Sequence, residues 1–128
     1  MAKHQGITGV QVFNYLLRDR DNPASVLAMI EHARTNARVV RTSLTNEVWE
    51  ATNETWMVLK DLLAQPVRES NLGEVLSTIR GRATLVRGAM YGTMLRNEVF
   101  NFARIGTYIE RADNTARILD MKYYVLLP

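Results

Sequence analysis

The chain has no cysteine, so neither a disulfide nor a thiolate metal site can contribute to its stability or chemistry. Three prolines and seven glycines in 128 residues leave few interruptions, which favours long helices over a turn-rich β fold. No apolar run approaches the length of a membrane span, and no signal peptide precedes His4. These absences favour a cytoplasmic protein that does not enter a membrane.

Lysine is also scarce, because 13 of the 16 basic residues are arginine. The planar fork of arginine suits partly buried pairing with carboxylates or phosphates. The net charge is only +3, although the isoelectric point is about 9.5. The low lysine content and the modest charge disfavour nucleic-acid binding, which we keep as a third alternative.

Apolar residues recur at helical spacing throughout, and no strand-like alternation persists. The pattern predicts five helices. The first ends at about residue 18, and the other four span about residues 23–42, 46–64, 72–90 and 97–125. Thr8, Asn22 and Thr45 are the predicted N-caps of the first three, and Gly88 and Gly92 mark the weakening end of the fourth. Short connections favour antiparallel neighbours. We therefore expect one all-α domain over residues 1–128, built as an antiparallel bundle of about five helices.

The last predicted helix places two carboxylates on its apolar side. With Ile109 at zero on a helical wheel, the apolar stripe extends to Ile105 and Leu119, whereas Asp120 and Asp113 fall at about 20° and 40°. The adjacent Glu110 and Arg111 point apart, with Arg111 on the far side. Asp113 and Asp120 therefore require partners from elsewhere.

The second predicted helix repeats this segment with the opposite charge. IEHARTNARVVR, from Ile30, aligns without gaps on IERADNTARILD, from Ile109. Arg34 matches Asp113, and Arg41 matches Asp120. We expect the two helices to pack through their alanines. An antiparallel crossing then pairs Arg41 with Asp113 and Arg34 with Asp120, whereas a parallel crossing exchanges the partners.

The two segments together define one charge cluster. Its members are Arg34, Arg38, Arg41, Glu110, Asp113, Arg117 and Asp120. We interpret it first as a structural lock on helix register, because buried ion pairs specify register better than they add stability. The alternative is a pocket for a ligand or partner, since paired charges near small residues can line a cavity.

Several segments resemble the alpha-E family, a bacterial all-helical domain named for a Glu-Arg motif. They are DNPAS, ARTNARVVR, EVWE and, above all, ERADNTARILDMKYYVLLP, in which the motif corresponds to Glu110 and Arg111. The family domain is longer at both ends, so the chain resembles its central portion. Helices that lack neighbours would expose apolar faces, and we therefore expect a homo-oligomer.

The resemblance also implies a functional context. Members of the family are typically encoded beside, or fused to, ATP-grasp proteins of peptide-ligation or peptide-modification systems. It implies a non-catalytic accessory or interaction protein with an ATP-grasp partner. The alternative is part of an enzyme whose site is completed by another subunit or by missing segments.

The sequence contains few of the residue patterns that catalysis requires. His32 has no second histidine near it, and the Glu-x-x-His pairs of carboxylate-bridged metal bundles do not occur. The chain has no nucleophile elbow and no phosphate-binding loop. We predict no catalytic residue, no cofactor and no metal ligand.

Two further sets of residues receive structural interpretations. Glu47, Glu50 and Glu54 are taken as a solvated helix face, with an acidic docking strip as the alternative. The larger aromatic residues are assigned to the core, with a stacking platform as the alternative. The arginines of the fourth helix are assigned to interhelical pairs or to side chains that extend along apolar surface, with phosphate contact as the alternative. The aromatic residues are Trp49, Trp56, Phe100 and Phe102, and the arginines are Arg80, Arg82 and Arg87.

The predicted pair of Arg41 and Asp113 leads to a first test. If the two side chains pair, replacing either one strands a charge and costs about 3–5 kcal/mol, and the second replacement then costs little more. A double-mutant cycle in urea, with Arg41→Met and Asp113→Asn, measures this coupling. Additive losses in the free energy of unfolding would exclude the pair.

Overall fold

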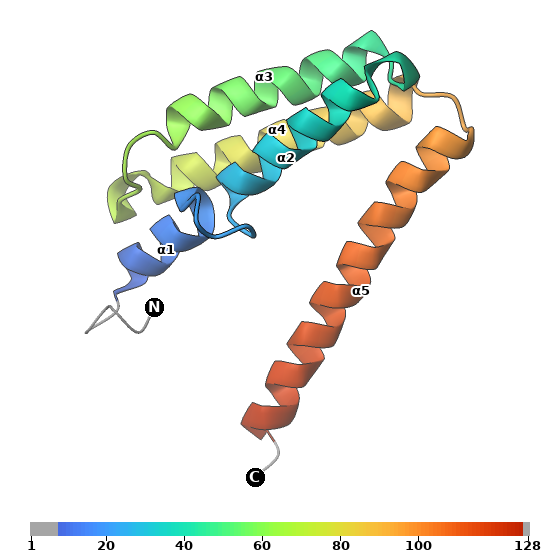
Figure 1. Cartoon of the computed structure of the whole chain (residues 1–128). Coiled ribbons are helices and arrows are strands. Elements are labelled where there is room, and N and C mark those ends of the chain that lie inside the picture. Colours follow the sequence, from blue (N-terminus) through green and yellow to red (C-terminus); the bar gives the residue numbers. More distant parts are fainter. Residues whose placement is uncertain (1–7, 127–128) are drawn as a thin grey trace. The chain divides into compact units, whose positions relative to one another are not determined.

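The computed structural model describes the backbone of residues 8–126 and the side chains of residues 8–119. Within this range the chain forms five α-helices, one short 3-10 helix and no strand (Figure 1). The helices are α1 (Gly9–Arg18), α2 (Val26–Val39), η1 (Arg41–Ser43), α3 (Asn46–Leu62), α4 (Glu69–Thr93) and α5 (Glu98–Leu126). The predicted all-α fold is confirmed. No helix in this part of the chain is long and apolar enough to cross a membrane.

The chain divides into two compact units, Met1–Met94 with α1 to α4 and Leu95–Pro128 with α5. In the first unit, α3 packs against both α2 and α4, and α1 packs against α2. Contacts between Thr45 and Thr93, and between Thr55 and Arg82, show that α3 and α4 run antiparallel. The expectation of a single domain stays a prediction.

Local capping decides where most helices begin. Thr8 starts α1 with a reciprocal pair, in which its hydroxyl accepts from the Gln11 backbone N–H and its own N–H donates to the Gln11 side chain. The Thr45 hydroxyl accepts from the Val48 N–H at 3.3 Å at the start of α3. Both predicted caps are therefore confirmed.

The predicted start of the second helix at Asn22 and Pro23 is wrong. Ser25 is the N-cap of α2, and its fully buried side chain accepts from the Ala28 N–H. Asn22 instead accepts from the Ala24 N–H, two residues ahead, and donates to the Tyr15 carbonyl of α1. An asparagine that bonds its own chain two residues on forms a turn rather than a cap, so α2 begins three residues after Pro23.

The fourth helix is longer at both ends than predicted. It begins at Glu69 rather than near Leu72, and it continues through Gly88 and Gly92 to Thr93. Each interior glycine costs a helix about 1 kcal/mol relative to alanine. Packing of α4 along α3, up to the 2.6 Å contact between the hydroxyls of Thr45 and Thr93, offsets that cost.

The hydrophobic core of the first unit gathers at the end where α1 packs. Trp56 and Leu59 of α3 and Val75 of α4 are buried there, together with Leu17 of α1 and Leu27 of α2. The prediction that Trp56 belongs to the core is confirmed. Phe100 is also buried, but Phe102 is 72% exposed, so the assignment of Phe102 to the core is wrong.

Asn14 and Arg18 tie α1 to the connection between α3 and α4. The Asn14 amide donates to the Val67 carbonyl at 2.9 Å and accepts from the Val67 N–H at 2.8 Å. Arg18 donates to the carbonyls of Leu63 and Ala64, just beyond the end of α3. Two side chains of α1 thus satisfy backbone groups of the connection between α3 and α4, which have no helical partners.

We expect Asn14→Ala to lower the free energy of unfolding by about 2 kcal/mol, because the N–H and the carbonyl of Val67 both lose their partner. Urea denaturation measures the change. Asn36→Ala, at an exposed position of α2, is the matched control and should alter stability by less than about 0.5 kcal/mol. Equal effects of the two substitutions would contradict this role of Asn14.

Candidate interaction surfaces

Two of the three arginines that the predicted cluster takes from the second helix contact α3. Arg34 donates through Nε to the Asn53 side chain at 2.8 Å. Arg41, in η1, lies over the Trp49 ring at 5.1 Å and reaches the Asn46 side chain at 3.4 Å. Arg38 is exposed. These contacts hold the α2–η1 segment on α3 without using a carboxylate.

The predicted cluster residues of α5 form a local pair. Arg117 Nε donates to Asp113 Oδ2 at 2.9 Å, four residues apart on the same helix, and both side chains are exposed. This hydrogen bond and the adjacent negative charge raise the pKa of Arg117 above its ordinary value. The spacing of Asp113 and Arg117 could have predicted this pair, because residues four positions apart face each other on a helix.

The pairs predicted between Arg41 and Asp113 and between Arg34 and Asp120 join the first unit to the second. The side chain of Asp120 lies outside the described residues. The packing of α2 on α5 and both cross-helix pairs therefore stay predictions. Among the described side chains, no group of three or more histidine, aspartate or glutamate residues gathers as it would around a metal ion.

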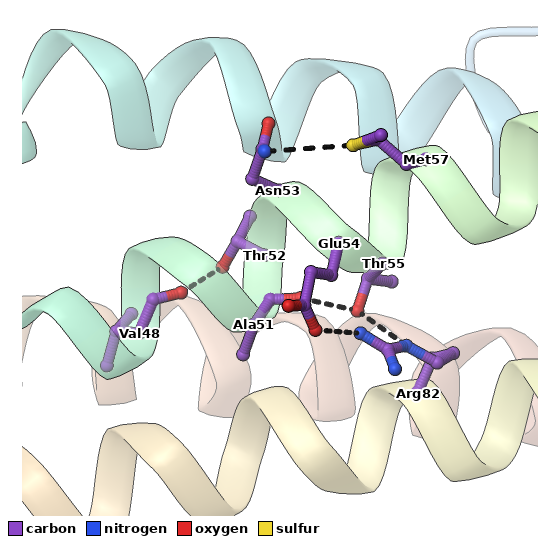
Figure 2. Close-up of polar contacts among 8 residues, drawn as sticks. All are labelled: Val48, Ala51, Thr52, Asn53, Glu54, Thr55, Met57 and Arg82. Atoms are coloured by element: carbon purple, nitrogen blue, oxygen red, sulfur yellow. Dashed lines mark hydrogen bonds and ion pairs between the residues drawn. The ribbon is translucent and has the colours of Figure 1, made fainter.

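An arginine of α4 links that helix to α3, as Figure 2 shows. Arg82 donates through Nε to the Thr55 hydroxyl at 3.2 Å, and its Nη2 lies 3.5 Å from Glu54 Oε2. Thr55 is buried, and its hydroxyl donates in turn to the Ala51 carbonyl at 2.7 Å. The interhelical interpretation of the α4 arginines is confirmed for Arg82.

A groove lies between the first half of α3 and the second half of α4, and we call it the α3–α4 groove. It is a shallow depression, largely open to solvent, with a volume of about 490 Å³. Glu47, Glu50 and Glu54 line it from α3. Leu85, Gly88 and Ala89 line it from α4. The sequence had shown the acidic residues but not the groove, because the small residues of α4 were interpreted only as a weak helix end.

The described part of α5 exposes large apolar side chains. We call this set the α5 apolar face. It consists of Phe102, Ile105, Tyr108, Ile109 and Leu119, which are between 48% and 72% exposed. Arg104 and Arg111 contact one member of this set, with guanidinium groups 5.4 Å and 5.7 Å from the centre of the Tyr108 ring. The stripe that the sequence predicts to be buried is thus an exposed apolar surface.

The Glu-Arg pair lies within this stretch of α5. Glu110 and Arg111 are both exposed, and Arg111 contacts Tyr108, three residues before it. A family model described as a predicted alpha-helical domain with a conserved ER motif, named Alpha-E, matches residues 1–128. The chain belongs to the Alpha-E family.

Neither the curated proteins nor the solved structures contain a match to this Alpha-E chain. Within its sequence, Glu110 and Arg111 are the only glutamate followed directly by an arginine, and their assignment to the ER motif stays a prediction. In this Alpha-E chain the guanidinium of Arg111 contacts the ring of Tyr108.

The contact between Thr55 and Arg82 leads to a test. Thr55→Val keeps the side-chain shape but removes the acceptor of a mostly buried guanidinium, so we expect a loss of about 1–2 kcal/mol in the free energy of unfolding. Thr35→Val is the matched control, because the Thr35 hydroxyl also donates four residues back but is exposed. Similar losses in urea for the two variants would exclude a specific role for the contact with Arg82.

Proposed function

We propose that the chain is a non-catalytic helical interaction module that binds helical partners through the α5 apolar face. The exposure of this face carries the proposal: Phe102 is 72%, Ile109 64% and Leu119 62% exposed. Large contiguous apolar surface on a polypeptide in water typically marks a site of association. A helix that exposes such a stripe gains stability by packing it against another helix.

The charged residues around the face support binding rather than chemistry. Asp113 and Arg117 neutralise each other at the surface, and Arg111 lies against an aromatic ring. These arrangements suit the polar rim of a helix–helix contact. They do not place an acid or a base in a pocket, as general acid–base catalysis requires.

Two partners fit the proposal. One is a second copy of the chain, because each copy presents the same exposed apolar face. The other is an ATP-grasp protein of a peptide-ligation or peptide-modification system, which the family resemblance suggests. In that system the chain would act as an accessory protein that holds the ATP-grasp partner by its α5 helix.

A pair of isoleucines on opposite sides of α5 provides the test. Ile109 belongs to the apolar face, whereas Ile118 lies nine residues later and so about 180° away around the helix. We expect Ile109→Glu to abolish self-association measured by light scattering, because it places a charge in the contact. Ile118→Glu introduces the same residue at a similarly exposed position and should leave association unchanged.

The same two variants test the ATP-grasp partner. Purified ATP-grasp protein encoded beside the chain should bind the wild type and the Ile118→Glu variant in a biosensor assay, but not the Ile109→Glu variant. A wild-type chain that is monomeric at high concentration and that binds no such protein would overturn the proposed function.

A further inference from the structure

We propose that a pocket beside Lys60 binds the phosphate group of a small phosphate ester. We call it the Lys60 pocket, and it lies where the connection between α1 and α2 meets the end of α3. It has a volume of about 320 Å³ and is partly open to solvent. All its lining residues belong to the first unit, so the proposal does not depend on the α5 apolar face.

The lining of the Lys60 pocket is cationic. Its charged residues are three cations, Arg18, Arg20 and Lys60, and one carboxylate, Asp61, so the net charge is +2. Among the described residues, Asp61 forms no ion pair with any of the three. A phosphate monoester carries a charge of about −1.5 to −2 near pH 7. The pocket therefore matches the charge of one phosphate group.

One aromatic ring holds two of these cations. The guanidinium carbon of Arg20 and the ammonium nitrogen of Lys60 each lie 6.0 Å from the centre of the Trp56 ring. Trp56 is buried in the core, so it gives both side chains a fixed surface to rest on. Two like charges held against one ring repel each other. An anion that binds to both cations removes this repulsion.

The contacts of Arg20 and Lys60 within the chain leave donors for a ligand. Arg20 forms one ion pair with a described residue, Glu31, at 4.0 Å, and both side chains are about half exposed. An exposed pair at this distance contributes little. Lys60 forms no ion pair with a described residue. A guanidinium and an ammonium both form strong, charge-assisted hydrogen bonds to phosphate oxygens.

Arg18 has a different part, because it already binds the backbone. It donates to the carbonyl of Leu63 at 2.9 Å and to that of Ala64 at 3.1 Å. Carbonyl oxygens at and just beyond the C-terminus of a helix repel an anion, since they carry partial negative charge. By binding these carbonyls, Arg18 offsets the repulsion, and Arg20 and Lys60 are the groups that contact the phosphate.

The size of the pocket favours a phosphate ester over inorganic phosphate. Its volume is about ten times the share of one molecule in liquid water, so a phosphate group alone fills only part of it. Leu27 and Leu63 also line the pocket, and an organic group attached to the phosphate would contact them. A nucleic acid is a poorer match, because its row of phosphates requires a row of cations rather than one cluster.

Nuclear magnetic resonance of the isotope-labelled chain tests the Lys60 pocket, with phenyl phosphate as the probe in about 0.1 M salt at about pH 8, where the phosphate is doubly charged. We expect the indole N–H resonance of Trp56 to shift until the site is saturated, because the cations that bind the probe lie against its ring. Trp49, which lies against Arg41 and outside the pocket, is the internal control, and its indole resonance should not shift.

Substitutions of the cations identify the groups that bind the probe. Arg20→Gln and Lys60→Gln should each raise the dissociation constant at least about tenfold, because each removes a cation that contacts the phosphate. Lys60→Arg keeps the charge and should stay within about threefold of the wild type. Arg38→Gln removes the same charge at an exposed position of α2 outside the pocket and should leave binding unchanged.

Removal of the carboxylate from the lining should act in the opposite direction. Asp61→Asn makes the pocket more positive, so we expect the dissociation constant to fall at least about twofold. Glu47→Gln makes the same change in charge about 20 Å away along α3, which is about twice the screening length at this salt concentration. It should leave the dissociation constant unchanged.

Three results would overturn the proposal. The first is a Trp56 resonance that does not respond to phenyl phosphate. The second is unchanged affinity in both glutamine variants of the cations, with helical content shown to be intact by circular dichroism. The third is equal affinity for phenyl phosphate and inorganic phosphate. Should a glutamine variant fail to fold, equal affinities of Asp61→Asn and Glu47→Gln would overturn the proposal instead, because neither substitution removes a cation of the pocket.

Discussion

Arg82 reaches from α4 to the surface of α3, and its contacts with Thr55 and Glu54 fix the antiparallel register of the two longest helices in the first unit. Once this register is set, one side of α3 presents Trp56 and Leu59 to the core. The opposite side presents a row of glutamates next to the small residues of α4. The core and the groove are thus two consequences of a single helix pairing.

The distribution of apolar residues explains why association is central to the proposed function. At the end of the first unit where α1 packs, α1 and α2 supply Leu17 and Leu27 to the core, and the carbonyls that end α3 are bound by Arg18. Within the first unit, the described residues leave Leu85 in the α3–α4 groove half exposed, and the side chains of the α5 apolar face are between 48% and 72% exposed. A helical chain with such surfaces has more to gain from partners than from further contacts within the first unit.

Much of the charge pattern was visible in the sequence, but its partners were not. The alignment of IEHARTNARVVR with IERADNTARILD singled out Arg34, Arg41 and Asp113, and each of these residues does make a polar contact. The contacts are with Asn53, Asn46 and Arg117, whereas the predicted pairs across α2 and α5 stay predictions. An arginine fork donates to amide and carboxylate oxygens and also packs on aromatic rings, so residue type alone does not select among these partners.

The sequence by itself determined the helical class of the chain and the helix starts at Thr8 and Thr45, because capping and periodicity depend on residues a few positions apart. It misplaced the start of α2, where Asn22 and Ser25 could both serve as caps and a contact with Tyr15 of α1 accompanies the turn at Asn22. Only the tertiary structure decided that Glu47, Glu50 and Glu54 border a groove and that Phe102 is exposed. Both depend on which helices lie side by side, and that is set by contacts between residues far apart in the chain.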